Sequence, residues 1–449
     1  MKIIADFHIH SKYSRATSPT MDLEELNKWA QIKGVTVLGT GDFTHPAWFK
    51  NLQTKLEPAE PGLFVLRSSL RGARKRRGNP ENKDEIASSS TTAIETPRND
   101  EKLVRFILSS EISCIYKKAG KVRKVHLIVL APSMETVEKI NKKLGEIGNI
   151  KSDGRPILGL DSKELLKIIL DIDKDCFMVP AHLWTPWFSI FGSKSGFDTI
   201  EECFDDYSKY IYAVETGLSS DPAMNWRLSQ LDKVALLSNS DCHSPSKIGR
   251  EANVFDTELN YFKILETIKE KNPPIGEKNK FLYTVEFFPE EGKYHFDGHR
   301  SCKVSIDPRK SKKIICPVCK KPLVIGVLNR VEELADRPEG FMPKNATPFK
   351  SLIPLEEIIA DSINRTVAAK DVAIYYNKLT KNLGSEFDIL LEIKKQELEK
   401  FSLPEIAEGI LRVRDGRVKI EPGYDGVYGK IKIFDEAERK IKVKQKSLL

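Results

Sequence analysis

The sequence predicts an α/β fold in which a parallel sheet closes into a barrel, followed by a small zinc-binding region and a helical segment. Short apolar runs alternate with amphipathic helical patterns through the first 270 residues. Histidines and carboxylates stand at or just beyond the ends of these runs. A Cys/His-rich segment then follows a stretch marked by proline and glycine.

Apolar runs of strand length and amphipathic helical segments succeed one another in the first 270 residues. The expected strands are Ile3–Phe7, Val35–Thr40, Phe106–Ser109, Val125–Ala131, Phe177–Pro180, Ile211–Glu215 and Val234–Ser238. The expected helices are Asp22–Lys33, Met134–Leu144, Ser162–Ile172 and Asn260–Lys269. Such alternation is typical of parallel sheets covered by helices, and residues 1–270 are therefore predicted to form one barrel domain.

Residues 67–98 interrupt this alternation. A basic cluster is followed by the polar run Ser88–Thr92, with almost no apolar periodicity. The cluster comprises Arg71, Arg74, Lys75, Arg76 and Arg77. We expect a flexible insertion, either a solvated loop or an arm that touches DNA.

The composition changes near Lys271–Lys280, where two prolines and a glycine indicate a linker. We expect a zinc-binding module over residues 281–330. The remainder, 331–449, is expected to form a helical hairpin from Leu355–Leu383 and Glu386–Lys400, followed by a basic C-terminal region that contacts DNA.

The overall composition limits the function classes. A chain of 449 residues is too long for one compact core. Its 72 Lys+Arg against 64 Asp+Glu give a net charge of +8, which permits a polyanionic partner without requiring one. Neither a membrane-length apolar run nor a signal-peptide pattern is present, so a cytoplasmic protein is expected.

The N-terminal strand ends in Asp6-Phe7-His8-Ile9-His10. Because side chains alternate along a strand, His8 and His10 are expected on one side of it. A lone H-x-H is a weak signal, since structural histidines also occur in this spacing. Here, however, six of the eight histidines fall in the first domain, at strand ends or in the loops that follow.

The candidate metal ligands exceed what one tetrahedral ion accepts, and they suit two or three ions. They are His8, His10, Asp42, His45, Glu111, His126, His182, Asp241 and His243. Imidazole and carboxylate without thiolate favour zinc, manganese or iron over calcium. We expect zinc in this cluster, with magnesium or manganese as possible activating ions. A phosphoesterase reaction suits such a cluster.

A second metal site is predicted from the pattern H-x2-C…C-x2-C. Its ligands are His299, Cys302, Cys316 and Cys319, with His295 as a possible replacement for His299. Two chelating pairs separated by a loop predict a structural zinc knuckle, because a redox C-x-x-C would need a thioredoxin-like context. Eight Lys/Arg in 300–321, Arg300 among them, would suit a phosphate backbone; the alternative is a solvated knuckle.

Five aromatic residues follow the ligand candidate His182: Trp184, Trp187, Phe188, Phe191 and Phe197. An enzyme that inspects one base must take it out of the stack, which requires an aromatic pocket near the metals. Core packing is the alternative. Of these residues, Trp184, Trp187 and Phe188 are predicted to contact DNA.

The ligand order H-x-H, D-x-x-H, E, H, H and D-x-H resembles the PHP (polymerase and histidinol phosphatase) superfamily over residues 1–270. The resemblance implies a seven-stranded (β/α) barrel with up to three metal ions. It assigns the first ion to His8, His10, Glu111 and Asp241. It assigns the second to Glu111, His126 and His182. It assigns the third to His243 with His45 or Asp42, because the superfamily's adjacent Asp-His is spaced apart here. Catalysis is implied for Asp241, Glu111 and His8.

Nearly the whole chain resembles the endonuclease Q family of DNA repair nucleases, found mainly in archaea. Besides the zinc knuckle, the similar stretches are His182–Phe188, Glu215–Pro222, Ser238–Pro245, Val331–Ala335 and Tyr424–Gly429. Within them, Asp221 and Asn239 are further candidate DNA-binding residues. The resemblance implies nicking of double-stranded DNA on the 5′ side of uracil, hypoxanthine, xanthine or an abasic site.

Two other functions stay open at this point, a small-molecule phosphatase of the histidinol-phosphate type and a non-catalytic DNA-binding accessory protein. The chain ends Gln445-Lys446-Ser447-Leu448-Leu449. This ending resembles part of a sliding-clamp-binding peptide without its aromatic pair, so weak clamp binding or a plain frayed terminus is expected.

Overall fold

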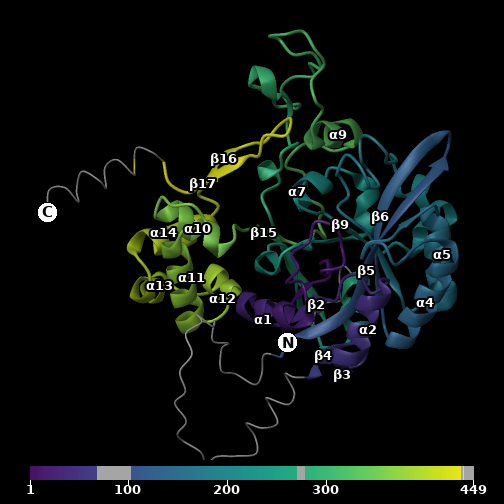
Figure 1. The fold of residues 1–449 in the computed structure, drawn as a ribbon. Helices are drawn as coiled ribbons and strands as arrows, with labels where there is room; N and C mark the ends of the chain where they lie inside the picture. Colours follow the sequence, from purple (N-terminus) through teal and green to yellow (C-terminus); the bar gives the residue numbers. More distant parts are fainter. Residues whose placement is uncertain (68–102, 271–278, 436–437, 439–449) are drawn as a thin grey trace, which may run out of the picture.

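The computed structural model describes residues 1–67, 103–270, 279–435 and 438. The predicted insertion at 67–98, apart from its first residue, lies outside the described residues. The clamp-like ending and most of the linker near 271–280 lie outside them as well. Figure 1 shows a large α/β body, a helical group beside it, and a segment that projects from the body between them.

One sheet of eleven strands runs through the body, with the order β15-β12-β11-β1-β2-β5-β4-β3 and with β6, β7 and β8 attached through β5. These strands are β1 (Lys2–Asp6), β2 (Val37–Gly39), β3 (Leu56–Pro58), β4 (Phe64–Leu66), β5 (Arg105–Lys118), β6 (Lys121–Ala131), β7 (Ile157–Leu158), β8 (Phe177–Pro180), β11 (Ala252–Asp256), β12 (Lys280–Glu286) and β15 (Phe349–Ser351). A mixed α/β fold is therefore confirmed. The register places Ala5 beside Val37 and Val37 beside Arg105, both in parallel ladders.

The prediction of a uniformly parallel sheet was wrong for β5 and β6. These two long strands form an antiparallel hairpin with Leu108 opposite Ala131 and Lys118 opposite Lys121. The turn consists of Ala119 (φ 51°) and Gly120 (φ 75°), the conformation that joins adjacent strands with the natural twist. Glu111, expected just beyond a strand, consequently lies inside β5, and His126 lies in β6, within a predicted strand.

The strand pairing of the described residues does not close into the expected seven-stranded barrel. Strands β9 (Ala213–Glu215) and β10 (Ala235–Leu237) form a separate parallel pair. Backbone contacts bridge the two gaps that this pair leaves at the carboxyl ends of the strands. Between β8 and β9, Leu183 N donates to Glu215 O at 3.0 Å, and between β10 and β1, His10 N donates to Cys242 O at 3.1 Å. These contacts draw the ends of β1, β8, β9 and β10 toward one another.

Helices cover the outside of the sheet, as the sequence pattern predicts. They are α1 (Leu23–Lys33), α2 (Pro46–Lys55), α4 (Met134–Ile147), α5 (Ser162–Ile172), α6 (Ile200–Phe204), α7 (Pro222–Asn225) and α8 (Tyr261–Lys269). The side chains of Asp22, Ser133, Asp161 and Asn260 accept hydrogen bonds from first-turn backbone N–H groups, which fixes four of the starts. Helix α2 was not predicted, although Pro46 marks its first turn.

The C-terminal helices differ from the expected hairpin. Five short helices replace it: α10 (Leu355–Ser362), α11 (Lys370–Leu383), α12 (Glu386–Leu391), α13 (Lys395–Phe401) and α14 (Pro404–Arg414). The helix predicted over Leu355–Leu383 breaks after Ser362, and Asn364 adopts a left-handed φ of 54°. The second predicted helix breaks after Leu391, and Pro404 starts one more.

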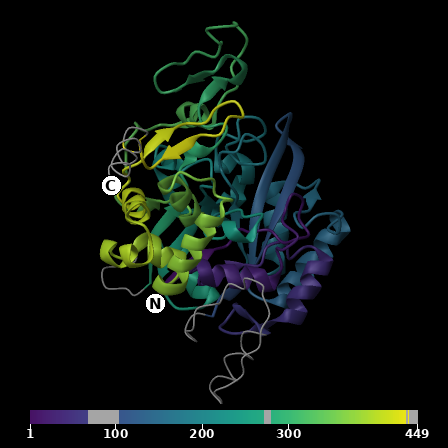
Figure 2. The same cartoon turned by 60° about the vertical axis from the view of Figure 1, so that its left-hand side comes forward.

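These helices rest on the α/β body, as the turned view shows (Figure 2). The buried Lys33 Nζ of α1 lies 2.6 Å from Glu386 Oε2 of α12. The same carboxylate accepts hydrogen bonds from the Tyr376 hydroxyl at 2.6 Å and from Leu355 N at 3.0 Å. One buried carboxylate thus connects α10, α11 and α12 to the first helix of the chain.

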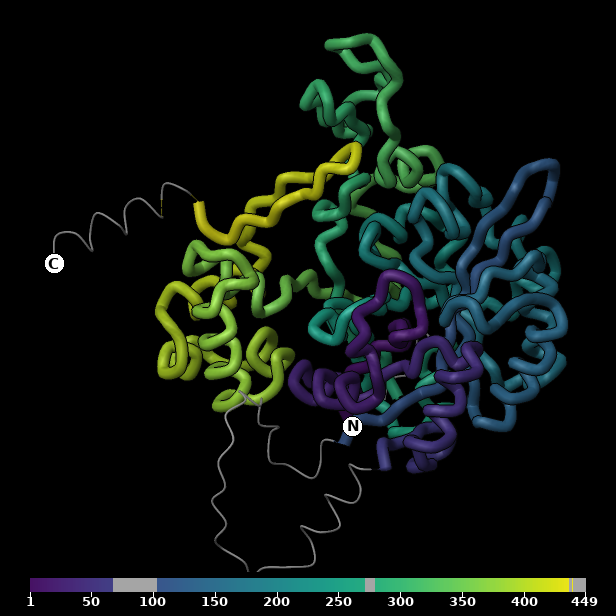
Figure 3. The backbone as a smooth tube through the Cα atoms, viewed as in Figure 1, coloured from purple at the N-terminus to yellow at the C-terminus, as the bar shows by residue number. Residues whose placement is uncertain are grey.

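The projecting segment (Figure 3) contains three of the seven cysteines, Cys302, Cys316 and Cys319. It comprises β13 (Asp297–His299), β14 (Val304–Ile306) and the loop to α9 (Val327–Leu334), and the hairpin of β16 (Lys419–Glu421) and β17 (Lys430–Lys432) runs beside its base. The boundary expected at residue 281 falls inside β12, which pairs with β11 of the main sheet. Among the described residues, no helix has the length and apolarity that a membrane crossing requires.

Candidate metal centre

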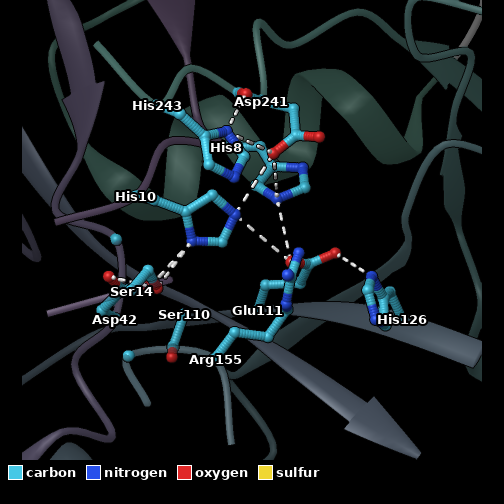
Figure 4. Close-up of polar contacts among 12 residues, drawn as sticks. His8, His10, Ser14, Asp42, Ser110, Glu111, His126, Arg155, Asp241 and His243 are labelled. Carbon is cyan, nitrogen blue, oxygen red and sulfur yellow. Dashed lines mark hydrogen bonds and ion pairs between the residues drawn. The ribbon is translucent and has the colours of Figure 1, made fainter. Parts of the chain in front are cut away.

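Four side chains positioned by the strands β1, β5 and β10 converge at one point (Figure 4). His8 and His10 follow β1. Phe7, which precedes His8, and Ile9, which lies between the two histidines, pack in the core. Glu111 lies in β5 and Asp241 follows β10. Nε2 of His10 is 3.3 Å from Glu111 Oε2 and 3.2 Å from Asp241 Oδ1, and Nε2 of His8 is 3.6 Å from each of the same two atoms. The alternation of β1 therefore delivers both imidazoles to one side, as predicted.

Glu111 also faces a second pair of imidazoles. Its Oε1 lies 2.7 Å from His126 Nδ1 and 3.1 Å from His182 Nε2, and the two imidazole nitrogens are 3.2 Å apart. His126 extends from β6, the hairpin partner of β5, and His182 follows β8. One carboxylate oxygen thus faces each group of histidines, the arrangement of a carboxylate that bridges two ions.

A third group differs from the expected one. His10, Asp241 and His243 bring one donor atom each within 4.8 Å of the others, and neither Asp42 nor His45 joins them. The Asp42 carboxylate instead accepts from Ser11 N and the hydroxyls of Ser11 and Ser14, and lies 3.0 Å from His10 Nδ1.

His45 lies outside the cluster altogether. Its Nε2 is 3.1 Å from the carbonyl oxygen of Lys151, and its ring stacks on Tyr13 at 4.5 Å. Neither Asp42 nor His45 therefore belongs to the groups of donor atoms that the described residues bring together. Asp42 holds a histidine in place, and His45 holds a loop.

Glu215, which was not among the predicted ligands, contacts two of the predicted histidine ligands. Its carboxylate accepts from His8 Nδ1 at 3.0 Å, from His182 N at 2.8 Å and from Asn239 Nδ2 at 2.9 Å. A hydrogen bond to Nδ1 turns Nε2 of His8 toward the cluster, as Asp42 does for His10. Its place at the end of a predicted strand could have identified it, because the same feature identified the other carboxylates.

The electrostatics of the cluster fit a bound cation. Burial lowers the pKa of His8, but the carboxylates of Glu215, Asp241 and Glu111 outweigh it and hold that pKa well above its usual value. Burial raises the pKa of Glu111, but His126, His8 and Arg155 hold it well below its usual range. His8 Nε2, His10 Nε2 and Asp241 Oδ1 are buried without a hydrogen-bond partner. Buried donor atoms of this kind are those that a metal ion would satisfy.

The backbone at the cluster is strained. Asp42, His182 and Asp241 have φ values of 48°, 30° and 45°, in the left-handed region that L-residues rarely adopt. Gly41 (φ 61°) precedes Asp42, and a Cβ there would lie 2.4 Å from Ile9 O. Strain of this kind persists where the surrounding packing enforces it, and it turns these side chains toward the centre.

The aromatic stretch after His182 divides between the core and the surface. Trp184, Phe191 and Phe197 are buried, and Trp184 Nε1 donates to Asn225. Core packing is therefore the better interpretation for these three, and the burial of Trp184 speaks against its predicted role in contacting DNA. Trp187 is 50% exposed, and Phe188 packs on His126 with ring centroids 4.6 Å apart. Lys124 Nζ lies 4.9 Å from the Trp187 ring and 5.3 Å from the Phe188 ring.

Two other predicted DNA contacts have structural partners. Asn239 is buried and accepts from Phe7 N and Asn253, so it supports the end of β1. Asp221 caps α7 by accepting from Met224 N at 2.8 Å. Arg300 is exposed on the projecting segment, where its backbone N–H donates to Asp425.

The projecting segment brings together the predicted zinc ligands. Donor atoms of His299, Cys302, Cys316 and Cys319 lie within 4.8 Å of one another, and Cys319 Sγ is 3.3 Å from His299 Nδ1. His295, the suggested replacement, is outside this group, and burial lowers its pKa to about 4. The donor set suits a tetrahedral zinc ion.

Comparison with known proteins covers the whole chain. A crystal structure of the lesion-specific endonuclease PfuEndoQ from Pyrococcus furiosus aligns with a TM-score of 0.80 and 28% identity, over 98% of this chain and 97% of that one. The fold is that of endonuclease Q. A second endonuclease Q structure, in complex with a 27-mer duplex bearing an abasic lesion at the active site, aligns with a TM-score of 0.78 and 28% identity over 97% and 98% of the two chains.

Two sequence relatives also match this chain. YqxK of Bacillus subtilis is 29% identical over 96% of this chain and 99% of its own length. The MJ0043 protein of Methanocaldococcus jannaschii is 36% identical over 55% of this chain, and the match spans only 31% of that protein. The family model for the MJ0043 C-terminal domain matches residues 354–417, which form helices α10 to α14.

Proposed function

We propose that this protein is a DNA repair endonuclease that hydrolyses the phosphodiester 5′ to a deaminated base or an abasic site. The observation that carries the proposal is the cluster of His8, His10, Glu111 and Asp241 within a fold that aligns with endonuclease Q over 98% of this chain. The abasic duplex bound by one endonuclease Q neighbour supports the same class of substrate here.

The chain's own residues suggest a division of labour. His8, His10, Glu111 and Asp241 would hold one ion, His126 and His182 with Glu111 a second, and His243 with His10 and Asp241 a third. When bound, such ions lower the pKa of a coordinated water and neutralise the phosphate that it attacks. Glu215 and Asp42 orient the imidazoles of His8 and His10, so that the ligand atoms are fixed before substrate arrives. Zinc suits these donors, and magnesium or manganese could activate the enzyme.

We also infer that the sheet acts as a seven-stranded PHP-type barrel. The strands β1, β2, β5, β6, β8, β9 and β10 follow one another around a ring if the two backbone bridges at their carboxyl ends are counted. All the proposed ligands then lie at or near one end of that ring, which is where α/β barrels carry their chemistry.

Trp187 and Phe188 are proposed to line the path of a flipped base. Phe188 has a left-handed φ of 64° and packs directly on His126, while Trp187 exposes its ring beside it. His182 Nδ1 is 3.1 Å from the Thr185 hydroxyl, which donates to Trp187 O at 2.9 Å. This chain of contacts sets the exposed indole in a fixed relation to the metal cluster. Aromatic stacking of this kind accepts any base.

The projecting zinc segment supplies a second DNA-contacting surface in this proposal. Lys310, Lys312, Lys313, Lys320 and Lys321 are exposed on it, together with Arg300. Basic side chains on a rigid zinc module are suited to phosphate contacts, and their contribution should fall as salt rises.

A nicking assay tests the proposal. Labelled duplexes with one uracil, hypoxanthine or abasic site, and an undamaged duplex, are incubated with the protein and Mg²⁺ or Mn²⁺, with a sugar phosphate in parallel. We expect cleavage of the lesion strand only, with the cut mapped to the 5′ side of the lesion. Hydrolysis of the sugar phosphate without any nicking would favour the small-molecule phosphatase instead, and binding of damaged DNA without hydrolysis would favour an accessory protein.

A further inference from the structure

Two arginines beside the metal centre belong to none of its ligand groups. Arg155 Nη1 lies 3.0 Å from Glu111 Oε2, the oxygen that faces His8 and His10, and its side chain is 25% exposed (Figure 4). Arg15 lies in the loop that follows His10, and its side chain is 76% exposed. Arginine is not expected to bind a metal ion, because its guanidinium group stays protonated.

A single buried aspartate organises both arginines. Asp153 is 6% exposed, and its carboxylate accepts from Arg155 N at 3.1 Å and from Arg15 N at 3.4 Å. The same carboxylate forms an ion pair with Arg15 Nε at 3.2 Å. Asp153 thereby ties the loop of Arg15 to the loop of Arg155, whose guanidinium group contacts Glu111 of the cluster.

The loop of Arg155 is fixed on every side. Gly154 N donates to Tyr13 O at 3.0 Å, and the Thr44 hydroxyl donates to Gly154 O at 3.1 Å. His45 contacts the carbonyl of Lys151 in the same loop. Only glycine fits at 154, because a Cβ there would lie 2.3 Å from Asp42 Oδ2. This explains why Asp42 and His45, which lie outside the ligand groups, stand so near the cluster.

We propose that Arg155 and Arg15 form a phosphate subsite that binds two successive phosphates of the cleaved strand. Arg155 takes a non-bridging oxygen of the scissile phosphate, and Arg15, farther out, takes that of the neighbouring nucleotide. The guanidinium fork matches phosphate oxygens in shape and charge. Asp153 holds the Arg15 guanidinium and the Arg155 backbone, and Glu111 holds the Arg155 guanidinium, so that little side-chain freedom is lost on binding. The inference rests on the proposed nuclease function and names how it grips its substrate.

A purely structural role for Arg155 makes a different prediction. If Arg155 only neutralised Glu111, its removal would disturb the carboxylate and lower the metal content of the protein. If it binds phosphate, its removal leaves the metal content and melting temperature unchanged and slows the reaction. Metal content therefore separates the two roles independently of activity.

The experiment compares Arg155→Gln, Arg155→Lys and Arg15→Gln with a matched control, Arg105→Gln. Arg105 lies at the start of β5, the strand of Glu111, and pairs with Glu60 at 2.6 Å, so its loss also breaks an Arg–Glu pair. Single-turnover cleavage of an abasic duplex is measured with Mn²⁺, affinity for the same duplex is measured in EDTA at several salt concentrations, and bound metal is counted for each protein.

For Arg155→Gln we expect a rate about 10²–10³-fold lower, as for the loss of one preorganised donor to a developing charge, with partial recovery in Arg155→Lys. For Arg15→Gln we expect weaker DNA affinity and a salt dependence reduced by about one unit of slope. Arg105→Gln should match the wild type. A normal rate in Arg155→Gln, or a lower rate accompanied by lost metal, overturns its role, and an unchanged slope in Arg15→Gln overturns the second half.

Hydrolysis of bis(p-nitrophenyl) phosphate keeps this test separate from the proposed function. A wild-type protein that hydrolyses this small diester but nicks no damaged DNA contradicts the repair function, and Arg155→Gln must still lower the small-diester rate. The salt dependence of DNA affinity is measured without turnover, and both arginine variants should lower its slope. If neither variant lowers the slope, the proposed subsite is contradicted, whatever the enzyme cleaves.

Discussion

His10 and Asp42 illustrate what single residues at this centre do. The sequence placed both among the possible ligands, because each follows a strand. Their hydrogen bond shows that the imidazole faces the cluster with one nitrogen while the carboxylate supports the other. Spacing along the chain predicts which residues reach the same region. It does not predict which of two polar groups faces the ion, because that depends on donors such as Ser11 and Ser14.

Replacing Asp241 or His8 by alanine is expected to abolish cleavage without unfolding the protein. Both side chains face the centre with atoms that have no other partner, and the loss of a ligand removes the ion's hold on the reacting water. Nicking of an abasic duplex and thermal unfolding are measured on each variant. Either variant retaining cleavage would show that the ligand groups are misassigned.

Two tryptophans of the same stretch should respond in opposite ways. Trp184→Ala should lower stability by about 3–5 kcal/mol, because a buried indole leaves a cavity. Trp187→Ala should leave stability unchanged and weaken binding of the abasic duplex by about 1–3 kcal/mol, the worth of one stacked base. Denaturant titration measures the stability of each variant, and titration with the abasic duplex measures its DNA affinity. Equal effects of the two variants on DNA binding would contradict the stacking role.

At the scale of elements, the sequence predicted those with strong local signals. Helices α4, α5 and α8 start at residues with capping side chains, and all three were expected close to their observed bounds. The antiparallel β5–β6 hairpin was missed because Ala119-Gly120 lacks the Asn-Gly or Asp-Gly sequence that usually indicates such a turn. The helical pattern over 355–383 likewise concealed a break at 363–369, since the apolar spacing resumes in phase with α11.

The zinc knuckle should behave as a separate element. In Cys316→Ser/Cys319→Ser, we expect the loss of one bound zinc and weaker DNA binding, because structural zinc supplies much of a small module's folding free energy. The metal cluster lies on other elements, so its own ions should remain. Metal counting, DNA titration and circular dichroism measure these outcomes, and Cys176→Ser, at a buried cysteine outside both sites, is the control. Unchanged zinc in the double variant would contradict the knuckle assignment.

At the scale of the whole molecule, the C-terminal helices depend on the α/β body. The sequence indicated separate regions but not their attachment, because Lys33 and Glu386 are 353 residues apart and neither belongs to a motif. Burial raises the pKa of the Glu386 carboxyl, but Lys33 outweighs it and holds that pKa below its usual value. The ion pair therefore stabilises the folded state above the unfolded-state pKa of Glu386, and this contribution is lost as the pH falls through the lower folded-state value.

Glu386→Ala is expected to destabilise this attachment by about 3–5 kcal/mol, because it leaves the Lys33 ammonium buried without a partner. Limited proteolysis should then cut between the body and α10 sooner than in the wild type. The double variant Lys33→Met/Glu386→Leu should recover much of the loss, since apolar side chains remove the unpaired charge. If Glu386→Ala resists proteolysis as well as the wild type does, other contacts hold the helices on the body.

The position of β1 has a consequence for biosynthesis. The strand Lys2–Asp6 is made well before β11 (Ala252–Asp256), with which it pairs, and the histidines that follow it meet Asp241 and His243. At translation speeds of about 5–20 residues per second, the intervening 235 or so residues take roughly 12–50 s to emerge. For that interval the nascent chain displays an unpaired strand edge and an incomplete set of metal donors. Ion capture at the proposed centre would therefore wait until the ribosome has released His243, and it would occur together with closure of the sheet around β1.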